Sequence, residues 1–274
     1  MNPEASRPRV AAAQSGLRVS AVIAVGAFVP SLESAIRAVL AEPWIDELVL
    51  VDAGADGADA SRLRGLQADR RDVRFIQSGQ PLTVTQARNL GAARAAGRWL
   101  LFLDPDVVVQ RGAVERLVKA GRLARSPWIV GGALTDANGR RRGVTAGARL
   151  GRRPTPVERV DGGFLLTPRA EFLGLGSFDE DYVGHGETRD LCRRARTGGG
   201  SVWLQPAAEG VEFEGARRKN RAVDAADRVS GAALFARKHA RTPVERIVIL
   251  LATPLIMAGA ALRALALTPL RRRS

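Results

Sequence analysis

The stretch Leu101-Phe102-Leu103-Asp104-Pro105-Asp106-Val107 decides how this chain is interpreted. The apolar run Trp99–Leu103 predicts a buried strand, and the two aspartates come directly after it. Two carboxylates one residue apart at the end of a strand make an oxygen-rich site of the kind that Mg²⁺ or Mn²⁺ prefers. Alternatively, Asp104-Pro105 only starts a turn before a helix predicted over residues 113–123. The triplet alone does not decide between these interpretations, so its neighbours matter.

Strands and helices alternate around this stretch. The predicted strands cover residues 17–25, 47–51, 73–77 and 99–103, and the predicted helices cover residues 30–41, 60–68, 84–96 and 113–123. This order predicts an α/β fold with a mostly parallel central sheet and helices on both faces. Asp52 then lies at the same sheet edge as Asp104 and Asp106, where open sheets of this kind bind ligands.

The composition sets the bounds on function. The chain has 274 residues, of which 46% are hydrophobic, so it can bury the core of one large α/β domain. Its formal net charge of +14 permits phosphorylated ligands, nucleic acid or an anionic membrane as partners, although a coding bias towards arginine also explains it. The single cysteine, Cys192, excludes an internal disulfide and fits a reducing compartment.

Two other classes of protein fit the sequence less well. A dinucleotide-binding domain needs a Gly-x-Gly-x-x-Gly turn after the first strand, and only Gly26 stands there. A nucleic-acid-binding protein is disfavoured because the arginines are dispersed, aromatic residues make up only 5%, and no recognition motif is found. We therefore expect no nucleic acid among the partners.

Further sequence blocks follow one another in a fixed order. They are Val19–Val25, Val51-Asp52-Ala53-Gly54-Ala55-Asp56-Gly57, Ala87-Arg88-Asn89-Leu90-Gly91 with the Asp-x-Asp triplet, Gly162-Gly163-Phe164-Leu165-Leu166, Gly176-Ser177-Phe178-Asp179-Glu180 and Gly186-Glu187-Thr188-Arg189-Asp190-Leu191. Together they resemble the family 2 glycosyltransferases, which have the nucleotide-diphospho-sugar-binding GT-A fold. Phe235-Ala236-Arg237-Lys238-His239 is similar to the tail of the rhamnosyltransferase-like subgroup, which builds bacterial surface polysaccharides.

The resemblance implies a metal-dependent, inverting transfer of a sugar from a nucleotide-diphospho-sugar to a saccharide or lipid-linked acceptor in cell-envelope polysaccharide synthesis. Val25, Asp52, Arg88 and Asp104 would bind the donor nucleotide, with Asp52 on the base and Asp104 on the ribose side. Asp106 would bind a divalent cation, Mg²⁺ or Mn²⁺, that neutralises the diphosphate leaving group. Further candidates for contact with the acceptor or the diphosphate are Gly163, His185, Arg217 and Arg218. The two arginines belong to a basic loop after the last of these blocks, which could fold over the diphosphate.

The chain departs from the family where the general base is expected. The family has Glu-Asp-x-Asp-Leu, so Thr188 occupies the position credited with this role, and a threonine cannot serve as base at neutral pH. Glu187 is then the candidate catalytic base, and His185 is the other. Glu187 also fits a carboxylate that is stabilised by a helix N-terminus. A catalytically inactive GT-A scaffold or regulator of a polysaccharide pathway is the alternative function.

Two more features remain open at this point. The family commonly has a histidine shortly after Pro206, and the nearest equivalents here are Glu212 and Glu214. Arg140-Arg141-Arg142 and Arg152-Arg153 flank a glycine-rich stretch. They form either a solvated basic loop or a contact surface for an anionic acceptor.

The chain divides by composition. Residues 1–16 predict a disordered leader without the apolar core of a signal peptide. Residues 17–215 form the predicted GT-A domain, with a donor half at 17–110 and an acceptor half at 111–215, and residues 216–243 a basic loop and helix. Residues 244–274 predict a membrane-associated helical tail, because the uncharged run 247–262 is flanked by arginines but is shorter than the roughly 20 residues that span a bilayer. The alternative is packing of this tail on the catalytic domain or on a second subunit. We expect a peripheral or monotopic protein on the cytoplasmic side of a bacterial inner membrane.

Overall fold

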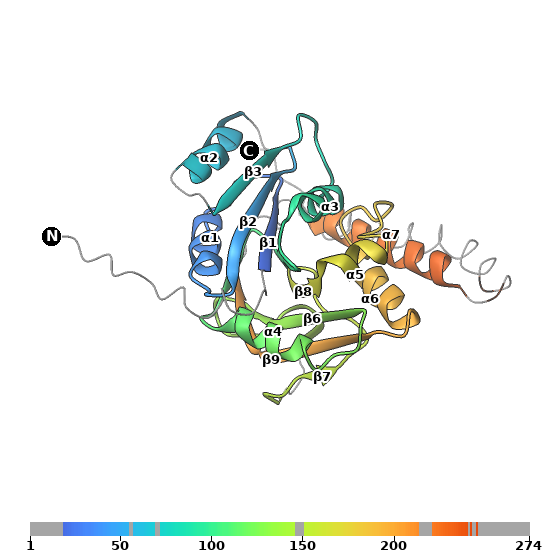
Figure 1. The fold of residues 1–274 in the computed structure, drawn as a ribbon. Coiled ribbons are helices and arrows are strands. Elements are labelled where there is room, and N and C mark those ends of the chain that lie inside the picture. Colours follow the sequence, from blue (N-terminus) through green and yellow to red (C-terminus); the bar gives the residue numbers. More distant parts are fainter. Residues whose placement is uncertain are drawn as a thin grey trace.

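The structure is a computed structural model that describes residues 19–54, 57–68, 72–145, 151–213, 221–240, 242 and 245. Its centre is one mixed sheet with the strand order β3-β2-β1-β4-β8-β6-β9-β5, and β7 pairs with β9 (Figure 1). The strands are β1 Val19–Val25, β2 Ile45–Asp52, β3 Val73–Gln77, β4 Trp99–Leu103, β5 Val107–Val109, β6 Trp128–Thr135, β7 Thr155–Pro156, β8 Phe164–Pro168 and β9 Ser201–Glu212. The helices are α1 Leu32–Leu40, α2 Gly57–Ala68, α3 Val84–Arg94, α4 Ala113–Gly121, α5 Arg169–Gly174, α6 Glu187–Thr197 and α7 Arg221–His239.

One half of the sheet is parallel. Strands β3, β2, β1 and β4 all run in the same direction, so their carboxyl ends meet at one edge. Successive side chains of β4 point to opposite faces: Leu101 packs in one core and Phe102 in the other. Such a strand is buried on both sides, which is why its sequence is continuously apolar.

The other half of the sheet is mixed. Strand β8 enters between β4 and β6 and runs antiparallel to both, whereas β9 runs parallel to β6 and antiparallel to β5. The predicted α/β class with helices on both faces is confirmed, but the parallel pairing predicted for most of the sheet holds only for part of it. Apolar runs mark strands without marking their direction, and the described residues between β6 and β8 contain no α-helix that would indicate a parallel crossover.

Helices cover both faces of the sheet (Figure 1). Apolar side chains of α1, α2 and α4, such as Ile36, Leu63 and Leu117, belong to one hydrophobic core. Those of α3, α5 and α6 belong to the other core, as Ala87 and Phe172 show. The sheet thus has two buried faces, which leaves its edges and strand ends as the places where polar chemistry can be exposed.

Several elements differ in length from their predicted ranges. Strand β2 begins at Ile45 instead of residue 47, α2 begins at Gly57 instead of residue 60, and α3 ends at Arg94 instead of residue 96. The predicted leader and nearly all of the predicted apolar tail lie outside the described residues. No helix within the described ranges is long and apolar enough to cross a membrane.

Candidate active site

The ends of β1 and β2 lie side by side at the carboxyl edge of the sheet. Val25 pairs with Asp52 in the parallel register, and the Ala53 amide donates to the Val25 carbonyl at 2.8 Å. The Gly54 amide donates to Asp52 Oδ1 at 2.9 Å, in a turn whose φ of 115° at Gly54 favours glycine. Val25 and Asp52, both predicted to bind the donor nucleotide, are therefore adjacent and buried.

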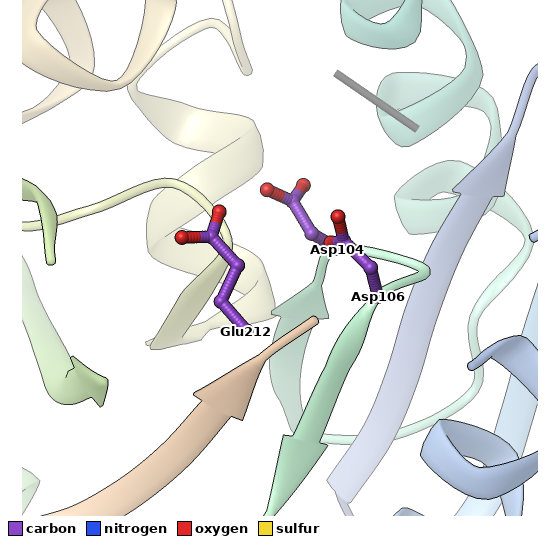
Figure 2. A group of neighbouring side chains, drawn as sticks. All are labelled: Asp104, Asp106 and Glu212. Carbon is purple, nitrogen blue, oxygen red and sulfur yellow. The ribbon is translucent and has the colours of Figure 1, made fainter. Parts of the chain in front are cut away.

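Three buried carboxylates converge where β4 ends. Asp104 and Asp106 follow β4, and Glu212 is the last residue of β9 (Figure 2). Antiparallel pairing of β5 with β9 places Val107 opposite Glu212, and the Phe213 amide donates to the Asp106 carbonyl at 2.9 Å. One oxygen from each of the three carboxylates lies within 4.8 Å of the others. We call Asp104, Asp106 and Glu212 the acidic cluster.

The acidic cluster suits a hard divalent cation. Its three potential ligands are all carboxylate oxygens, which is the donor type that Mg²⁺ and Mn²⁺ prefer. Three negative charges this close together repel one another, so a bound cation would stabilise them. Arg88 contacts Asp104, and Arg142 Nε lies 3.2 Å from Glu212 Oε2, which offsets part of the charge.

Arg88 contacts carboxylates from two distant parts of the chain. It lies on α3, which begins with a capping box between Thr83 and Gln86. The Arg88 side chain is only 3% exposed; Nη2 donates to Asp104 Oδ1, and Nη1 lies 3.4 Å from Glu187 Oε1. Arg88 was predicted to hold the nucleotide, and the structure adds that its guanidinium connects the carboxylate that follows β4 with the carboxylate that begins α6.

Glu187 is the first residue of α6. Thr188 Oγ1 donates to Glu187 Oε1 at 3.2 Å, which helps to fix the orientation of the Glu187 carboxylate. Glu187 Oε2 is buried and accepts no hydrogen bond within the described part of the chain. Gly186 precedes α6 with a φ of 111°, and a Cβ there would lie 2.5 Å from the Tyr182 ring. The helix start therefore has a fixed position, with one Glu187 oxygen available for a ligand hydroxyl.

Two glycines let the loop before β8 approach the carboxylates. The Asp104 amide donates to the Gly163 carbonyl at 3.0 Å. A Cβ at Gly163 would lie 2.5 Å from Asp104 Oδ2, and one at Gly162 would lie 2.3 Å from Thr188 Oγ1. Gly163 thus acts by leaving space beside Asp104.

These groups line one cavity of about 810 Å³, which we call the main cavity. Its volume is that of a small-molecule site, about 300–1,000 Å³. The predicted site residues that line it are Arg88, Asp104, Asp106, Gly163, His185 and Glu187, together with Glu212. Val25 and Asp52 stand at the neighbouring strand ends and do not line it. Arg217 and Arg218 lie outside the described residues.

Helix α7 forms a wall of the main cavity that the sequence did not indicate. Arg228 and Gly231 of α7 line the cavity, and a Cβ at Gly231 would lie 2.0 Å from the His185 carbonyl oxygen. The helix is attached to α6 because Asp190 of α6 interacts with His239 Nε2 of α7 at 2.7 Å. Asp190 also accepts from Arg194 Nε at 2.7 Å within α6, so both of its oxygens have partners.

Lys238 attaches the same helix to the loop before α6. Its ammonium contacts Asp179 and lies 2.6 Å from Asp181 Oδ2. Burial by itself would raise the pKa of Asp179, but the hydrogen bond and charge of Lys238 lower the pKa below its ordinary value. Lys238 and His239, at the end of α7, thus attach this helix to the loop before α6 and to α6 itself.

The sequence is similar to those of known glycosyltransferases. Residues 21–126 match the family model described as Glycosyl transferase family 2. The match covers β1 to α4, including the Arg88 motif and the Asp-x-Asp triplet. A protein of Drosophila melanogaster, "Putative polypeptide N-acetylgalactosaminyltransferase 13", is 27% identical over 199 residues, which are 61% of this chain and 36% of that protein. The chain thus spans about a third of the length of this relative.

Solved structures share the fold. The mannosyltransferase PcManGT from Pyrobaculum calidifontis, in complex with GDP-Man and Mn²⁺, is 17% identical with a TM-score of 0.62, and the match covers 91% of this chain and 74% of that one. TarS 1-349 from S. aureus in complex with UDP-GlcNAc is 12% identical with a TM-score of 0.61, covering 93% and 74%. GalNAc-T7 with UDP, GalNAc and Mn²⁺ is 18% identical with a TM-score of 0.63, covering 74% and 45%. The chain has the GT-A fold.

Proposed function

We propose that this protein is a metal-dependent, inverting glycosyltransferase that uses a nucleotide-diphospho-sugar donor. The observation that carries the proposal is the convergence of the acidic cluster, Arg88 and Glu187 on the main cavity at the carboxyl edge of β4. The family 2 match over residues 21–126 supports it. So do the structural neighbours, two of which were solved with Mn²⁺.

The donor would lie along the ends of the parallel strands. Val25 and Asp52 are placed to contact the nucleoside, and Asp104, Asp106 and Glu212 would hold the cation. When bound, the cation would neutralise charge that develops on the nucleoside diphosphate as it leaves. Arg88 keeps Asp104 in position and places a second positive charge beside it.

Glu187 would take the proton from the acceptor. In one displacement, the acceptor hydroxyl oxygen forms a bond to the anomeric carbon while the bond to the diphosphate oxygen breaks and its electrons leave with the diphosphate. The hydroxyl proton passes to the Glu187 carboxylate. A buried Oε2 without a hydrogen-bond partner in the described ranges is suited to accept this hydroxyl. A single displacement inverts the configuration at the anomeric carbon.

The donor proposal is tested by binding. Thermal unfolding of the full chain is measured with a panel of hexose and rhamnose donors carrying UDP, GDP or dTDP, each with and without Mn²⁺. We expect at least one donor to raise the unfolding temperature only when Mn²⁺ is present, because a ligand of the folded state stabilises it. Asp106→Ala should abolish this shift and Glu33→Gln, at an exposed site on α1, should not. A wild-type protein that responds to no donor would contradict the proposal.

The inactive scaffold is a second candidate because Thr188 occupies the position of the expected base. A scaffold would bind a donor without consuming it. Release of nucleoside diphosphate, measured with the donor that binds and a set of saccharide acceptors, separates the two functions. Transfer supports the enzyme, and binding without donor transfer or hydrolysis supports the scaffold.

We also propose that the protein works in envelope polysaccharide synthesis at the cytoplasmic face of a bacterial inner membrane, as a hexosyl- or rhamnosyltransferase with a lipid-linked acceptor. The support is the uncharged run 247–262 with arginines on both sides and Arg271-Arg272-Arg273 at the end. Each of these arginines contributes about 1 kcal/mol near anionic lipid.

Removal of residues 244–274 tests the membrane proposal. The shortened protein should sediment less with vesicles of anionic lipid than the full chain, because the apolar run and the basic end are both lost. Mn²⁺-dependent donor binding should persist in the shortened protein, since its site lies in the GT-A domain. Full-length protein that stays in the supernatant with such vesicles at low salt would contradict the membrane proposal.

A further inference from the structure

A second cavity, of about 400 Å³, lies at a bulge in β9. The pairing of β6 with β9 passes from Gly132↔Gln205 directly to Ala133↔Glu209, so residues 206–208 leave the ladder. Pro206 and Ala207 from this bulge line the cavity. We call it the arginine cavity, after the arginines that line it. Bulges of this kind occur next to functional sites, where they redirect the chain.

Four arginines from separate segments line the arginine cavity: Arg111 before α4, Arg116 on α4, Arg141 after β6 and Arg152 before β7. The acidic residue of the lining is Glu209, so the formal charge of these side chains is four minus one, or +3. Within the described ranges of the chain, none of the four forms an ion pair. Positive charges gathered this way repel one another unless an anion joins them.

Arg141 gives the strongest indication of a ligand. Its Nη1 is buried and has no hydrogen-bond partner among the described residues. Buried guanidinium nitrogens are normally paired, and the planar guanidinium is suited to a carboxylate or phosphate, with two parallel hydrogen bonds. An oxyanion bound beside Arg141 would accept from this nitrogen and offset the surplus of positive charge.

Arg141 also lines the main cavity, so the two cavities meet at this side chain. A molecule with one end near Glu187 can therefore extend past Arg141 into the arginine cavity. We infer that the acceptor carries an anionic group, a phosphate or a carboxylate, and that Arg111, Arg116, Arg141 and Arg152 bind it. This inference rests on the proposed function, which places the acceptor in the main cavity.

Calorimetric titration of the full chain tests the inference. The probes are inorganic phosphate, glucuronate and, as an uncharged control, glucose, in a low-salt buffer that contains EDTA. The double variant Arg116→Gln/Arg141→Gln removes two cavity charges. The matched control Arg37→Gln/Arg98→Gln removes two exposed arginines that line neither cavity. We expect the wild type to bind phosphate, glucuronate or both, but not glucose. The cavity variant should bind at least about tenfold more weakly, and the control should bind like the wild type.

The probe that binds also distinguishes the source of the anion. Binding of phosphate alone assigns a phosphate-bearing acceptor, and binding of glucuronate alone assigns an acidic saccharide. The inference is overturned if neither anion binds, if the cavity variant binds like the wild type, or if the control loses as much affinity as the cavity variant.

Failure of the inference can be told apart from failure of the proposed function. Mn²⁺-dependent donor binding is measured on the wild type and on the single variant Arg116→Gln, because Arg116 lines the arginine cavity and not the main cavity. Donor binding without anion binding overturns the inference alone. Anion binding at these arginines without binding of any donor overturns the proposed function and the role of the anion as part of an acceptor.

Discussion

The parallel and mixed halves of the sheet contribute to the candidate site in different ways. In the parallel half, Asp52 ends β2 and Asp104 directly follows β4, so their positions follow from local sequence. In the mixed half, Glu187 starts a helix and Glu212 reaches the site through the pairing of β9 with β5. The site residues of the parallel half are therefore placed by a repeated local pattern, whereas those of the mixed half depend on contacts between distant segments.

Ion pairs of Arg88 link residues from the two halves of the site. Arg88 contacts Asp104 and Glu187, and the acidic cluster takes two carboxylates from one half and Glu212 from the other. If Arg88 and the acidic cluster are functional, substitution of the proposed base should lower the rate of sugar transfer and leave donor affinity nearly unchanged. Substitutions that disturb Arg88 or the acidic cluster should lower both the transfer rate and the donor affinity.

The largest effect is expected for Glu187→Gln, which removes the proposed base and keeps an oxygen that can still accept from Arg88. The amide keeps the shape of the carboxylate and cannot take a proton, so the turnover number should fall about 100-fold or more. Donor affinity should change little. Steady-state kinetics with the donor and acceptor found by the binding screen measure both quantities. A variant that turns over normally would place the base elsewhere, with His185 as the next candidate in the main cavity.

An intermediate effect is expected for Gly163→Ala, at the junction of the halves. The added methyl group would lie 2.5 Å from Asp104 Oδ2, so the carboxylate or the loop must move. We expect a loss of about 1–3 kcal/mol in the free energy of unfolding, as for other overpacked sites, together with weaker Mn²⁺-dependent donor binding.

Gly174→Ala is the matched control, because a Cβ there meets nothing within 4 Å. Urea unfolding and donor titration of both variants make the comparison. Equal behaviour of the two alanine variants would show that the closeness of Gly163 to Asp104 is unimportant.

The smallest effect is expected for Lys238→Met, which tests how α7 is held on the acceptor half. Interaction with Lys238 lowers the pKa of Asp179, so its contribution is fully present above the ordinary carboxyl pKa and is lost as the pH falls through the lowered value. The pKa of Lys238 is raised, so its contribution is lost only at strongly alkaline pH. Both side chains are about a quarter exposed, so we expect a loss of about 1 kcal/mol or less at pH 7.

The effect of Lys238→Met should become smaller below about pH 4, where carboxyl groups titrate. Urea unfolding at pH 7 and at pH 3.5 measures this difference. Lys119→Met is the control, because Lys119 is 66% exposed and pairs only with Glu115 four residues before it on α4. A Lys238 effect that does not depend on pH would attribute the loss to packing.

The sequence predicts the parallel half well because its strands are rich in apolar residues and end close to Asp or Gly. Asp52, Asp104 and Asp106 could be placed at one sheet edge for this reason. The direction of β8 and the wall formed by α7 could not be predicted, since neither follows from a local pattern. Glu212 had only a weak signal, its place near a position where the family often has histidine, and its approach to Asp106 depends on the β5–β9 pairing. Arg141 was visible as part of a basic run, but its buried Nη1 was not.

The central claim is that one cation is held jointly by Asp104 and Asp106 from the donor half and Glu212 from the acceptor half. Binding of Mn²⁺, followed by electron paramagnetic resonance in the presence of UDP or GDP, tests it most directly in the wild type, Glu212→Gln and the exposed control Glu33→Gln. Loss of one charged ligand should weaken Mn²⁺ binding about tenfold or more in Glu212→Gln, and Glu33→Gln should match the wild type. Unchanged Mn²⁺ affinity in Glu212→Gln would contradict the claim and leave the cation to the donor half alone.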